Sequence, residues 1–395
     1  MSNATAILHR GKDAAIRRFH PWVFSGAIRQ WQGRPADGDI VDVLSAEGDF
    51  LGTGHFQDGS IQIRILSFAQ TAIDHTFWVS RLHNALQLRK TLGLVREGFN
   101  TCYRLVHGEG DGLPGLIVDV YGHTAVVQCH SIGMHRQRTE IAEALQQVLG
   151  PGLEAVYDKS SETLPSNYAS GVNSGWLYGS SNPGFVKENG LDFWVDWETG
   201  QKTGFFLDQR DNRQLVRQYA EGKTVLNAFC YTGGFSVYAL HAGAAHVDSV
   251  DSSARAIEIA VRNAAAQSGG DLRHQAHTAD VMKFLQASPS QHYDLMVVDP
   301  PAFAKSVDKR HNAVQAYKRL NAMAISKIKP GGLIFTFSCS QVVDRTLFYH
   351  TIVAAALEAA RPVRVLHHLR QPPDHPVSLF HPEGEYLKGL VLEIG

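Results

Sequence analysis

The chain has 395 residues, a formal net charge of −1, and 44% hydrophobic and 19% charged residues. This length exceeds one ordinary core and the composition is typical of a soluble folded protein, so we expect two or three globular domains and exclude a disordered chain. No stretch approaches the roughly 18 consecutive apolar residues of a membrane span, and the first ten residues lack the apolar region of a signal peptide. We therefore expect a cytoplasmic protein with no membrane partner.

The cysteines and histidines do not form a recognisable ligand pattern. The chain contains no CxxC pair and no HExxH string, so we expect neither a disulfide framework nor a metal site. Three of the four cysteines are expected to be small buried hydrophobic residues, as free cysteines commonly are. These three are Cys102, Cys129 and Cys230.

A basic and aromatic stretch lies between residues 10 and 34, where six cations face the single acid Asp13. Its aromatic residues are Phe19, Trp22, Phe24 and Trp31. Cations suit phosphates and aromatic rings suit unstacked bases, so the stretch is typical of a surface for single-stranded RNA. Core-facing aromatics beside solvated arginines would give the same pattern. The candidate RNA contacts are Arg17, Arg18, Trp22 and Arg29.

Short strand-like runs at residues 39–44, 50–55 and 61–68 are separated by glycines and predict a small β-barrel. An amphipathic helix is predicted over 74–92, so a first domain should end near residue 73. The glycines and the proline between residues 108 and 115 predict a tight turn before a buried strand. Residues 130–149 are predicted to form one helix, which ends at Gly150-Pro151-Gly152.

From residue 191 onward, strands and helices alternate in the βαβ manner, which predicts an α/β fold with a mostly parallel, doubly wound sheet. The candidate strands are 224–228, 246–250, 273–277, 293–298, 332–337, 363–369 and 386–394. Reactive groups in such sheets collect at the carboxyl ends of the strands.

The loop after the first of these strands suits a cofactor. Gly233 and Gly234 let the backbone approach a ligand, but the loop lacks the GxGxxG string that a dinucleotide pyrophosphate needs, so it fits S-adenosylmethionine better. Asp251 ends the second strand and is expected to accept from ribose hydroxyls, while Asp280 after the third strand could accept from an adenine amino group. A single acid at the end of a strand is often a helix N-cap. Here Asp251, Asp280 and Asp299 end three strands in register, which favours a cofactor site. The candidate contacts on the loop are Asn227, Phe229, Thr232 and Gly233.

Asp299-Pro300-Pro301 follows the fourth strand and suits the substrate. Successive prolines fix a rigid turn whose carbonyls can orient a base. Asp299 and Pro300 are the candidate catalytic residues of this turn. Phe303, also a candidate, could stack on a base that has been extruded from the RNA. The alternative is a plain structural turn that closes the strand.

Cys339 follows the fifth strand, opposite this turn. Carbon 5 of a pyrimidine is too weak a nucleophile to accept a methyl group unless a thiolate first adds at carbon 6, so a thiol here indicates pyrimidine carbon-5 methylation. A thiol must be activated to react near neutral pH, and Ser338 and Ser340 are candidate donors. The residue that removes the carbon-5 proton is not identified by the sequence. Asp299, Asp374 and His375 are candidates.

These motifs resemble the RlmI-like large-subunit ribosomal RNA cytosine-5 methyltransferases, class I enzymes that use S-adenosylmethionine. The resemblance covers nearly the whole chain and includes His20-Pro21-Trp22-Val23-Phe24, Asp111-Gly112-Leu113-Pro114-Gly115-Leu116, Thr203-Gly204-Phe205-Phe206-Leu207-Asp208-Gln209-Arg210, Asp299-Pro300-Pro301 and Ser338-Cys339-Ser340. It implies a PUA-like RNA-binding β-barrel in 1–73, a small central α/β domain in 74–190, and a Rossmann-like seven-stranded methyltransferase domain in 191–395. It also implies a homodimer and a ribosomal RNA substrate of the large subunit.

The same resemblance implies further contacts with S-adenosylmethionine at Lys202, Phe206, Asp208 and Arg210. Asn227 departs from the acid that many class I enzymes carry there. Sister enzymes of this architecture methylate a purine nitrogen without a thiol and supply the main alternative. An RNA-binding protein with an inactive methyltransferase scaffold and a small-molecule methyltransferase are the others.

Overall fold

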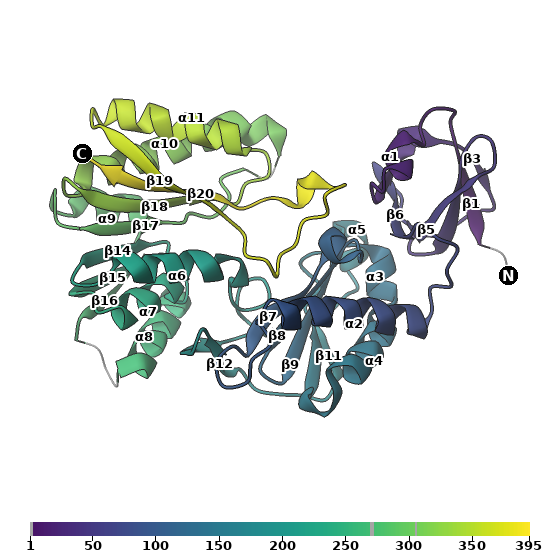
Figure 1. The fold of residues 1–395 in the computed structure, drawn as a ribbon, viewed down its shortest axis with the longest axis horizontal. Helices are drawn as coiled ribbons and strands as arrows, with labels where there is room; N and C mark the ends of the chain where they lie inside the picture. The colour runs from purple at the N-terminus through teal and green to yellow at the C-terminus, as the bar shows by residue number, and fades with distance from the viewer. Residues whose placement is uncertain (1–2, 269–271, 305) are drawn as a thin grey trace. The chain divides into compact units, whose positions relative to one another are not determined.

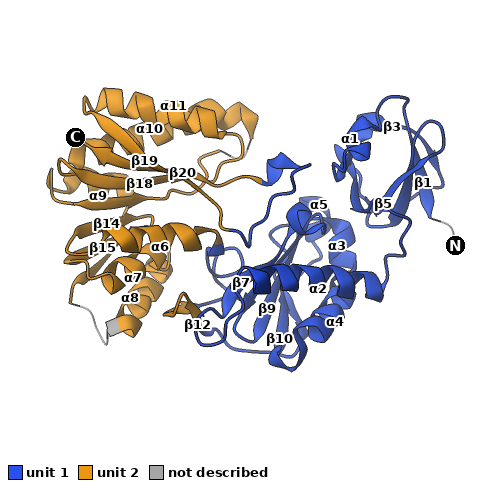
Figure 2. Ribbon diagram, in the orientation of Figure 1, with its two compact units in different colours: residues 1–186, 195–207, 373–384 blue, residues 187–194, 208–372, 385–395 orange. Residues whose placement is uncertain are grey.

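The computed structural model describes residues 3–268, 272–304 and 306–395. The chain forms two compact units, shown in blue and orange in Figure 2. The first contains residues 1–186, 195–207 and 373–384, and the second contains 187–194, 208–372 and 385–395. Each unit is therefore built from segments that are separated in the sequence. The division into domains 1–73, 74–190 and 191–395 stays a prediction.

A curled six-stranded sheet forms the N-terminal part of the first unit (Figure 1). Its strands are β1 (Ala4–Leu8), β2 (Trp22–Phe24), β3 (Ile28–Gln32), β4 (Ile40–Leu44), β5 (Phe50–Phe56) and β6 (Ile61–Ser67), in the order β2-β6-β5-β4-β1-β3, with helix α1 (Ala14–Arg17) after β1. The three predicted strands are β4 to β6. Gly54 permits the β5–β6 pair, because a Cβ atom there would lie 2.1 Å from the carbonyl oxygen of Arg64.

A five-stranded sheet forms the next part of the first unit. Its strands are β7 (Cys102–His107), β8 (Leu116–Tyr121), β9 (Thr124–Cys129), β10 (Ala155–Asp158) and β11 (Gly175–Tyr178), in the order β11-β10-β9-β8-β7. The predicted helix 74–92 is α2 (His75–Thr91), whose N-cap Asp74 accepts from the Phe77 N–H at 3.0 Å.

The single helix predicted over 130–149 is wrong. The structure has α3 (Ile132–Arg136) and α4 (Arg138–Leu149), followed later by α5 (Ser166–Ala169). The backbone leaves helical geometry at Gln137 (φ −90°, ψ 1°), next to Arg136, which donates to the Asp37 carbonyl at 2.7 Å. The interruption thus lies beside a contact with the loop between β3 and β4.

Residues 373–384 connect the last two strands of the second unit but pack within the first. Arg89 is fully buried and donates both to Asp111, at 2.8 Å, and to the Asp374 carbonyl, at 2.8 Å. The Arg104 N–H donates to the Asp374 carboxylate at 3.0 Å. A Cβ atom at Gly110 would lie 1.9 Å from the Pro376 carbonyl oxygen, so the close packing of this segment requires glycine there.

The seven-stranded sheet of the second unit has the order β16-β15-β14-β17-β18-β20-β19. Its strands are β14 (Thr224–Ala228), β15 (His246–Asp251), β16 (His274–Thr278), β17 (Leu295–Val298), β18 (Gly332–Ser338), β19 (Val363–Arg370) and β20 (Lys388–Ile394). The first five are parallel, while β20 runs antiparallel to both β18 and β19. The predicted α/β fold with a seven-stranded, mostly parallel sheet is confirmed.

Helices cover both faces of this sheet (Figure 1). They are α6 (Arg210–Tyr219), α7 (Gly234–His241), α8 (Ala254–Ser268), α9 (Val281–Ala287), α10 (Arg310–Lys327) and α11 (Arg345–Glu358). Helix α7 contacts both α6 and α8, helix α10 contacts both α9 and α11, and separate apolar clusters fill the two sides. This covering explains why the strands read as continuous apolar runs.

The hairpin β12 (Gly184–Glu188) and β13 (Leu191–Val195) precedes the second unit's main segment. Short 3-10 turns lie at Ser25–Ala27, Gly108–Asp111, Gly150–Gly152, Leu207–Gln209, Val307–Lys309 and Pro382–Gly384. Within the described ranges, no helix is both long and apolar enough to cross a membrane.

Candidate active site

The loop after β14 has a strained backbone. Phe229, Tyr231 and Gly233 have φ values of 60°, 47° and 78°. A left-handed conformation costs a residue other than glycine roughly 1–2 kcal/mol, and such residues gather where a fixed backbone shape serves a ligand. Gly233 also lies against α8, where a Cβ atom would be 3.0 Å from the Cβ of Ala260. The predicted cofactor loop is therefore held in a specific shape at the carboxyl edge of the sheet.

Asp251, the last residue of β15, is oriented by two backbone groups. Its Oδ2 accepts from the Tyr231 N–H at 3.0 Å and its Oδ1 accepts from the Ser253 N–H at 2.9 Å. A carboxylate oxygen can accept more than one hydrogen bond, so both oxygens retain capacity for two adjacent hydroxyls. This geometry suits the predicted ribose contact.

Asp280 is the N-cap of α9. Its Oδ1 accepts from the Lys283 N–H at 2.9 Å, and the residue is exposed. The capping role considered from the sequence is therefore present. A contact between its other oxygen and an adenine amino group stays a prediction.

Buried oxygens without partners test whether these residues fit a polar cofactor. Among the residues that the structure describes, Asn227 Oδ1, Thr232 Oγ1 and Asp208 Oδ1 are buried and accept no hydrogen bond. Such an acceptor costs roughly 1–3 kcal/mol unless a donor satisfies it. All three belong to the predicted cofactor set, so a ligand that carries hydroxyl and ammonium groups fits them. The Asn227 amide nitrogen donates to Ser236 Oγ at 2.8 Å.

Asp299 is part-buried in a crowded corner after β17. Gln209 Nε2 donates to its Oδ2 at 2.9 Å, while Tyr386 donates to Asp208 at 2.7 Å. Burial, and then the negative charge of Asp208, raise the pKa of Asp299 to about 7. Two carboxylates in one corner favour a cationic group of a ligand between them, and a carboxyl with this pKa can exchange a proton near neutral pH.

The Asp-Pro-Pro turn packs into the protein beyond Asp299. Pro300 is buried and Pro301 is exposed. The Phe303 ring is half-buried, with its centroid 4.7 Å from that of Tyr317 in an edge-to-face arrangement. Its packing against Tyr317 fixes the ring, and its stacking on a base stays a prediction.

The turn that carries Cys339 is tied to the Asp-Pro-Pro turn. Ser340 Oγ donates to the Ala304 carbonyl at 2.7 Å, and the Ser340 N–H donates to Ser338 Oγ at 3.4 Å. Because the hydroxyl proton of Ser340 goes to Ala304, the expectation that Ser340 donates to the thiol is wrong. Its role is to join the two loops.

Cys339 is the accessible thiol of the chain. It is half-buried, whereas Cys102, Cys129 and Cys230 are buried. Burial raises the pKa of the Cys129 thiol to about 12 and also raises the pKa of Cys230. The other thiols are therefore poor nucleophiles, as their expected structural role implies.

Lys388, which the sequence did not indicate, lies against the turn that carries Cys339. It begins β20, pairs with Ser338 in the antiparallel register, and its Nζ donates to the Ser340 carbonyl at 2.6 Å. Burial lowers the pKa of Lys388 to about 8, and the charge of Cys339 is the largest effect in the opposite direction. The available signal was a lone lysine just before the apolar run Gly389–Leu392.

The four cofactor contacts implied by the family resemblance are divided between the two units. Asp208 and Arg210 lie in the second unit, and Arg210 is 1% exposed and pairs with Glu188 at 3.4 Å. Lys202, which has a φ of 55°, and Phe206 belong to the first unit. Their contacts with a cofactor stay predictions.

Two of the candidate bases lie in the first unit. Asp374 and His375 are buried, and the Asp374 carboxylate lies 3.0 Å from His375 Nδ1. The Asp374 carboxylate also accepts from the Arg104 N–H, so its hydrogen bonds hold the segment 373–384 in the first unit. Asp299 is the candidate within the second unit.

The candidate RNA contacts lie around α1 and the first strands. Arg17 pairs with Asp13 and Asp49, each at 2.6 Å, while Arg18 and Arg29 are exposed. The Trp22 indole donates to Glu109 at 2.9 Å, and His381 packs against its ring at 4.3 Å. Phe19 and Phe24, at 51% and 49% exposure, offer more open rings than Trp22 does.

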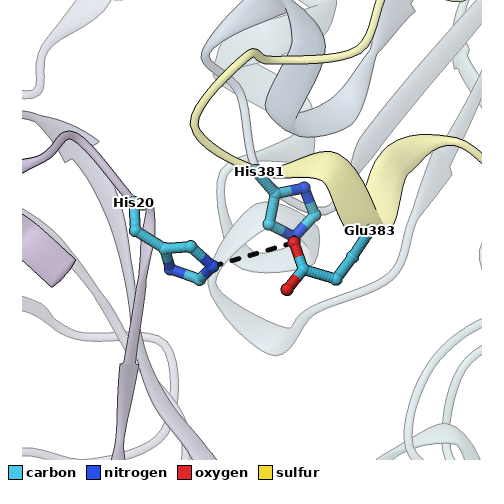
Figure 3. Close-up of side chains that lie close together, drawn as sticks. All are labelled: His20, His381 and Glu383. Atoms are coloured by element: carbon cyan, nitrogen blue, oxygen red, sulfur yellow. Dashed lines mark ion pairs between the residues drawn. The ribbon is translucent and has the colours of Figure 1, made fainter.

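Three potential metal ligands also meet in the first unit: His20, His381 and Glu383 (Figure 3). Each histidine Nε2 lies 3.8 Å from Glu383 Oε2. The Trp22 N–H donates to His20 Nδ1 at 3.2 Å, so the proton of the neutral His20 ring sits on Nε2, the atom a metal would need. This tautomer favours a contact from His20 to Glu383 over metal binding.

Known proteins resemble this chain in both its N-terminal sheet and its seven-stranded sheet. Residues 104–386 match the model of an S-adenosylmethionine-dependent methyltransferase family, and residues 6–68 match that of a PUA-like domain. The chain is 39% identical over 397 aligned positions to a ribosomal RNA large subunit methyltransferase I from Alteromonas mediterranea, covering 99% of both chains.

Two solved structures match the fold over the full length of both chains. One is a putative SAM-dependent methyltransferase from Streptococcus mutans, at 25% identity and a TM-score of 0.83. The other is a putative methyltransferase complexed with SAH, at 25% identity and a TM-score of 0.84.

Proposed function

The chain belongs to the S-adenosylmethionine-dependent methyltransferases, within the family of ribosomal RNA large subunit methyltransferase I, and on this premise we propose that it methylates carbon 5 of a cytosine in large-subunit ribosomal RNA. The proposed nucleophile is Cys339. The single observation that carries the proposal is the link between Ser340 and Ala304, because it joins the thiol-bearing turn to the turn that begins with Asp299.

The thiolate of Cys339 adds to carbon 6 of the cytosine, and the electron pair of the carbon 5–carbon 6 double bond moves into the ring. Carbon 5 then has enamine character and is nucleophilic. When bound, S-adenosylmethionine supplies the electrophilic methyl group, and S-adenosylhomocysteine leaves with the electron pair of the former sulfur–methyl bond. Loss of the carbon-5 proton expels the thiolate and restores the double bond.

Asp299 is the proposed acceptor of the carbon-5 proton. Its pKa of about 7 means that a carboxylate and a carboxyl are both populated near neutral pH, as a proton acceptor requires. Gln209 holds the carboxylate at 2.9 Å. The Asp299 side chain is also a proposed cofactor contact, together with Asp208.

RNA binding is assigned to the N-terminal sheet. Arg18 and Arg29 offer cations for phosphates, and the exposed rings of Phe19 and Phe24 offer stacking surfaces. The Phe19 ring also lies 5.4 Å from that of Phe380, which extends the aromatic surface. We therefore infer that the substrate is captured there. Because the proposed substrate is ribosomal RNA, we infer that the protein acts in the cytoplasm.

We further infer that the protein is a homodimer. β19 is an edge strand, and Val365 of β19 lines one surface hollow together with Val353 and Leu357 of α11, the last exposed to 75%. An apolar face along an unpaired edge suits a second copy of the chain. Light scattering should give twice the chain mass, and Leu357→Asp should give the monomer. Leu379→Asp, a change at an exposed leucine of the first unit, should leave the mass unchanged.

The direct test is to incubate ribosomal RNA with the enzyme and methyl-labelled S-adenosylmethionine, digest the RNA and identify the labelled nucleoside. We expect 5-methylcytidine. A labelled guanosine would favour the purine-nitrogen alternative, and cofactor binding without any transfer would favour an inactive scaffold.

A further inference from the structure

We propose that the ammonium group of Lys388 holds the Cys339 thiol as a reactive thiolate. Lys388 is a positioning residue in this account, because it acts on the nucleophile and not on the substrate. The inference builds on the proposed function, in which Cys339 attacks carbon 6, and it names the group that activates the attack.

The antiparallel pairing of β18 and β20 places Lys388 at this position. Ser338 is the last residue of β18 and lies opposite Lys388, so the lysine begins its strand where the thiol-bearing turn begins. Its Nζ donates to the Ser340 carbonyl at 2.6 Å, on the far side of Cys339 in the sequence. The hydrogen bond thus fixes the ammonium against the turn that holds the thiol.

The setting of Lys388 makes its charge effective. The residue is only 6% exposed, so water screens the ammonium weakly. Burial is the largest effect on Lys388 and lowers its pKa to about 8, while Cys339, Asp344 and Glu385 favour the charged form and Arg345 opposes it. Arg345 itself pairs with Glu385. Among the charged groups, Cys339 does most to offset the effect of burial on Lys388, as a neighbouring thiolate would.

The Ser340 hydroxyl does not replace this charge, because it donates its proton to the Ala304 carbonyl. Ser338 Oγ accepts from the Ser340 N–H, and a neutral hydroxyl there carries no charge to pair with a thiolate. A free thiol has a pKa near 8.5 and reacts as its thiolate, so a neighbouring cation is the means by which this turn can present a nucleophile at neutral pH.

The test is the rate of Cys339 alkylation by iodoacetamide between pH 5 and pH 10, followed on the Cys339 peptide by mass spectrometry. For the wild type we expect a midpoint below about 8.5, the value of a free thiol. Lys388→Met should raise the midpoint by about one to three pH units, the usual effect of losing an opposite charge nearby. Lys388→Arg should restore most of the shift.

Lys329→Met is the matched control. Lys329 lies at the other end of the sheet and pairs with Asp294 at 2.8 Å, so its loss should leave the midpoint unchanged. A wild-type midpoint at or above about 8.5 would overturn the inference even if Lys388→Met failed to fold. An unshifted midpoint in folded Lys388→Met would overturn it as well.

This readout does not depend on methyl transfer. If Cys339→Ala retained full methylation while the alkylation shift was present, the proposed function would fall and the ion pair would stand. If Cys339→Ala lost methylation and no shift appeared, the proposed function would stand and the role of Lys388 would fall.

Discussion

Ser340 Oγ donates to the carbonyl oxygen of Ala304 at 2.7 Å, across 36 residues of sequence, and so joins the turns after β18 and β17. Ser340→Ala should leave a buried carbonyl unpaired, at a cost of roughly 1–3 kcal/mol, and loosen the thiol-bearing turn. We expect methyl transfer to fall by about tenfold or more, since positioning of reacting groups is sensitive to small displacements. Affinity for S-adenosylmethionine should not change.

Single-turnover kinetics and calorimetry check these two outcomes. Ser326→Ala is the control, because Ser326 donates to the Met323 carbonyl at 2.8 Å on the exposed side of α10. Wild-type transfer rates in folded Ser340→Ala would show that the link between the turns is unimportant for the reaction.

Asp251 should be required for cofactor affinity. Asp251→Ala removes the acceptor for two ribose hydroxyls, and we expect a loss of about 1–3 kcal/mol in the binding free energy of S-adenosylmethionine. Calorimetry measures this directly. Glu258→Ala, a change at an exposed acid on the neighbouring α8, should bind normally. Equal affinity in wild type and folded Asp251→Ala would remove Asp251 from the cofactor site.

The RNA surface predicts a salt-dependent defect. Arg18→Ala combined with Arg29→Ala should weaken RNA binding and make the salt dependence shallower by about 0.7 for each lost phosphate contact on a single strand. Fluorescence anisotropy at several salt concentrations gives both quantities. The control is Arg364→Ala, because Arg364 is exposed but pairs with Glu393 at 2.7 Å. If the double variant kept the wild-type slope, RNA would bind elsewhere.

The raised pKa of Asp299 predicts an effect of pH on stability. Its folded pKa of about 7 lies above the unfolded value of about 3.9, so the unfolded chain ionises first as pH rises and the folded state loses stability until about pH 7. Asp299→Asn cannot ionise. Between pH 5 and pH 8, its free energy of unfolding should therefore rise by about 1–3 kcal/mol relative to wild type.

Urea unfolding at the two pH values tests this sign. Asp294→Asn is the control with the opposite character, because the Lys329 hydrogen bond lowers the pKa of Asp294 against the effect of burial. Between pH 5 and pH 8, the free energy of unfolding of Asp294→Asn should not rise relative to that of wild type. The same response in both variants would contradict a raised pKa at Asp299.

The sheet of the second unit could be predicted because its strands are short apolar runs between glycines and prolines. The run 224–228 is β14 without adjustment. The run 386–394 begins two residues too early, since the N–H groups of Tyr386 and Leu387 donate to Gln371 Oε1 before the strand starts. Such a side-chain contact leaves no periodic signal in the sequence.

Other features depended on contacts between distant residues. β1 and β3 pair with each other, but β3 is largely exposed and reads as part of a basic stretch, so neither was predicted as a strand. Lys388 was missed because its place beside Cys339 follows from the register of β18 and β20, across 49 residues. The thiol and the Asp-Pro-Pro turn were found because each ends a recognisable strand.

The most direct measurement of the central claim is covalent trapping on RNA that contains 5-fluorocytosine. Fluorine cannot leave as a cation, so an adduct between Cys339 and carbon 6 would persist after methyl transfer. We predict a denaturation-resistant protein–RNA band for wild type and for Cys230→Ala, whose thiol is buried, and none for Cys339→Ala. Absence of the band from active wild-type enzyme, or methylation by Cys339→Ala at the wild-type rate, would contradict covalent catalysis by Cys339.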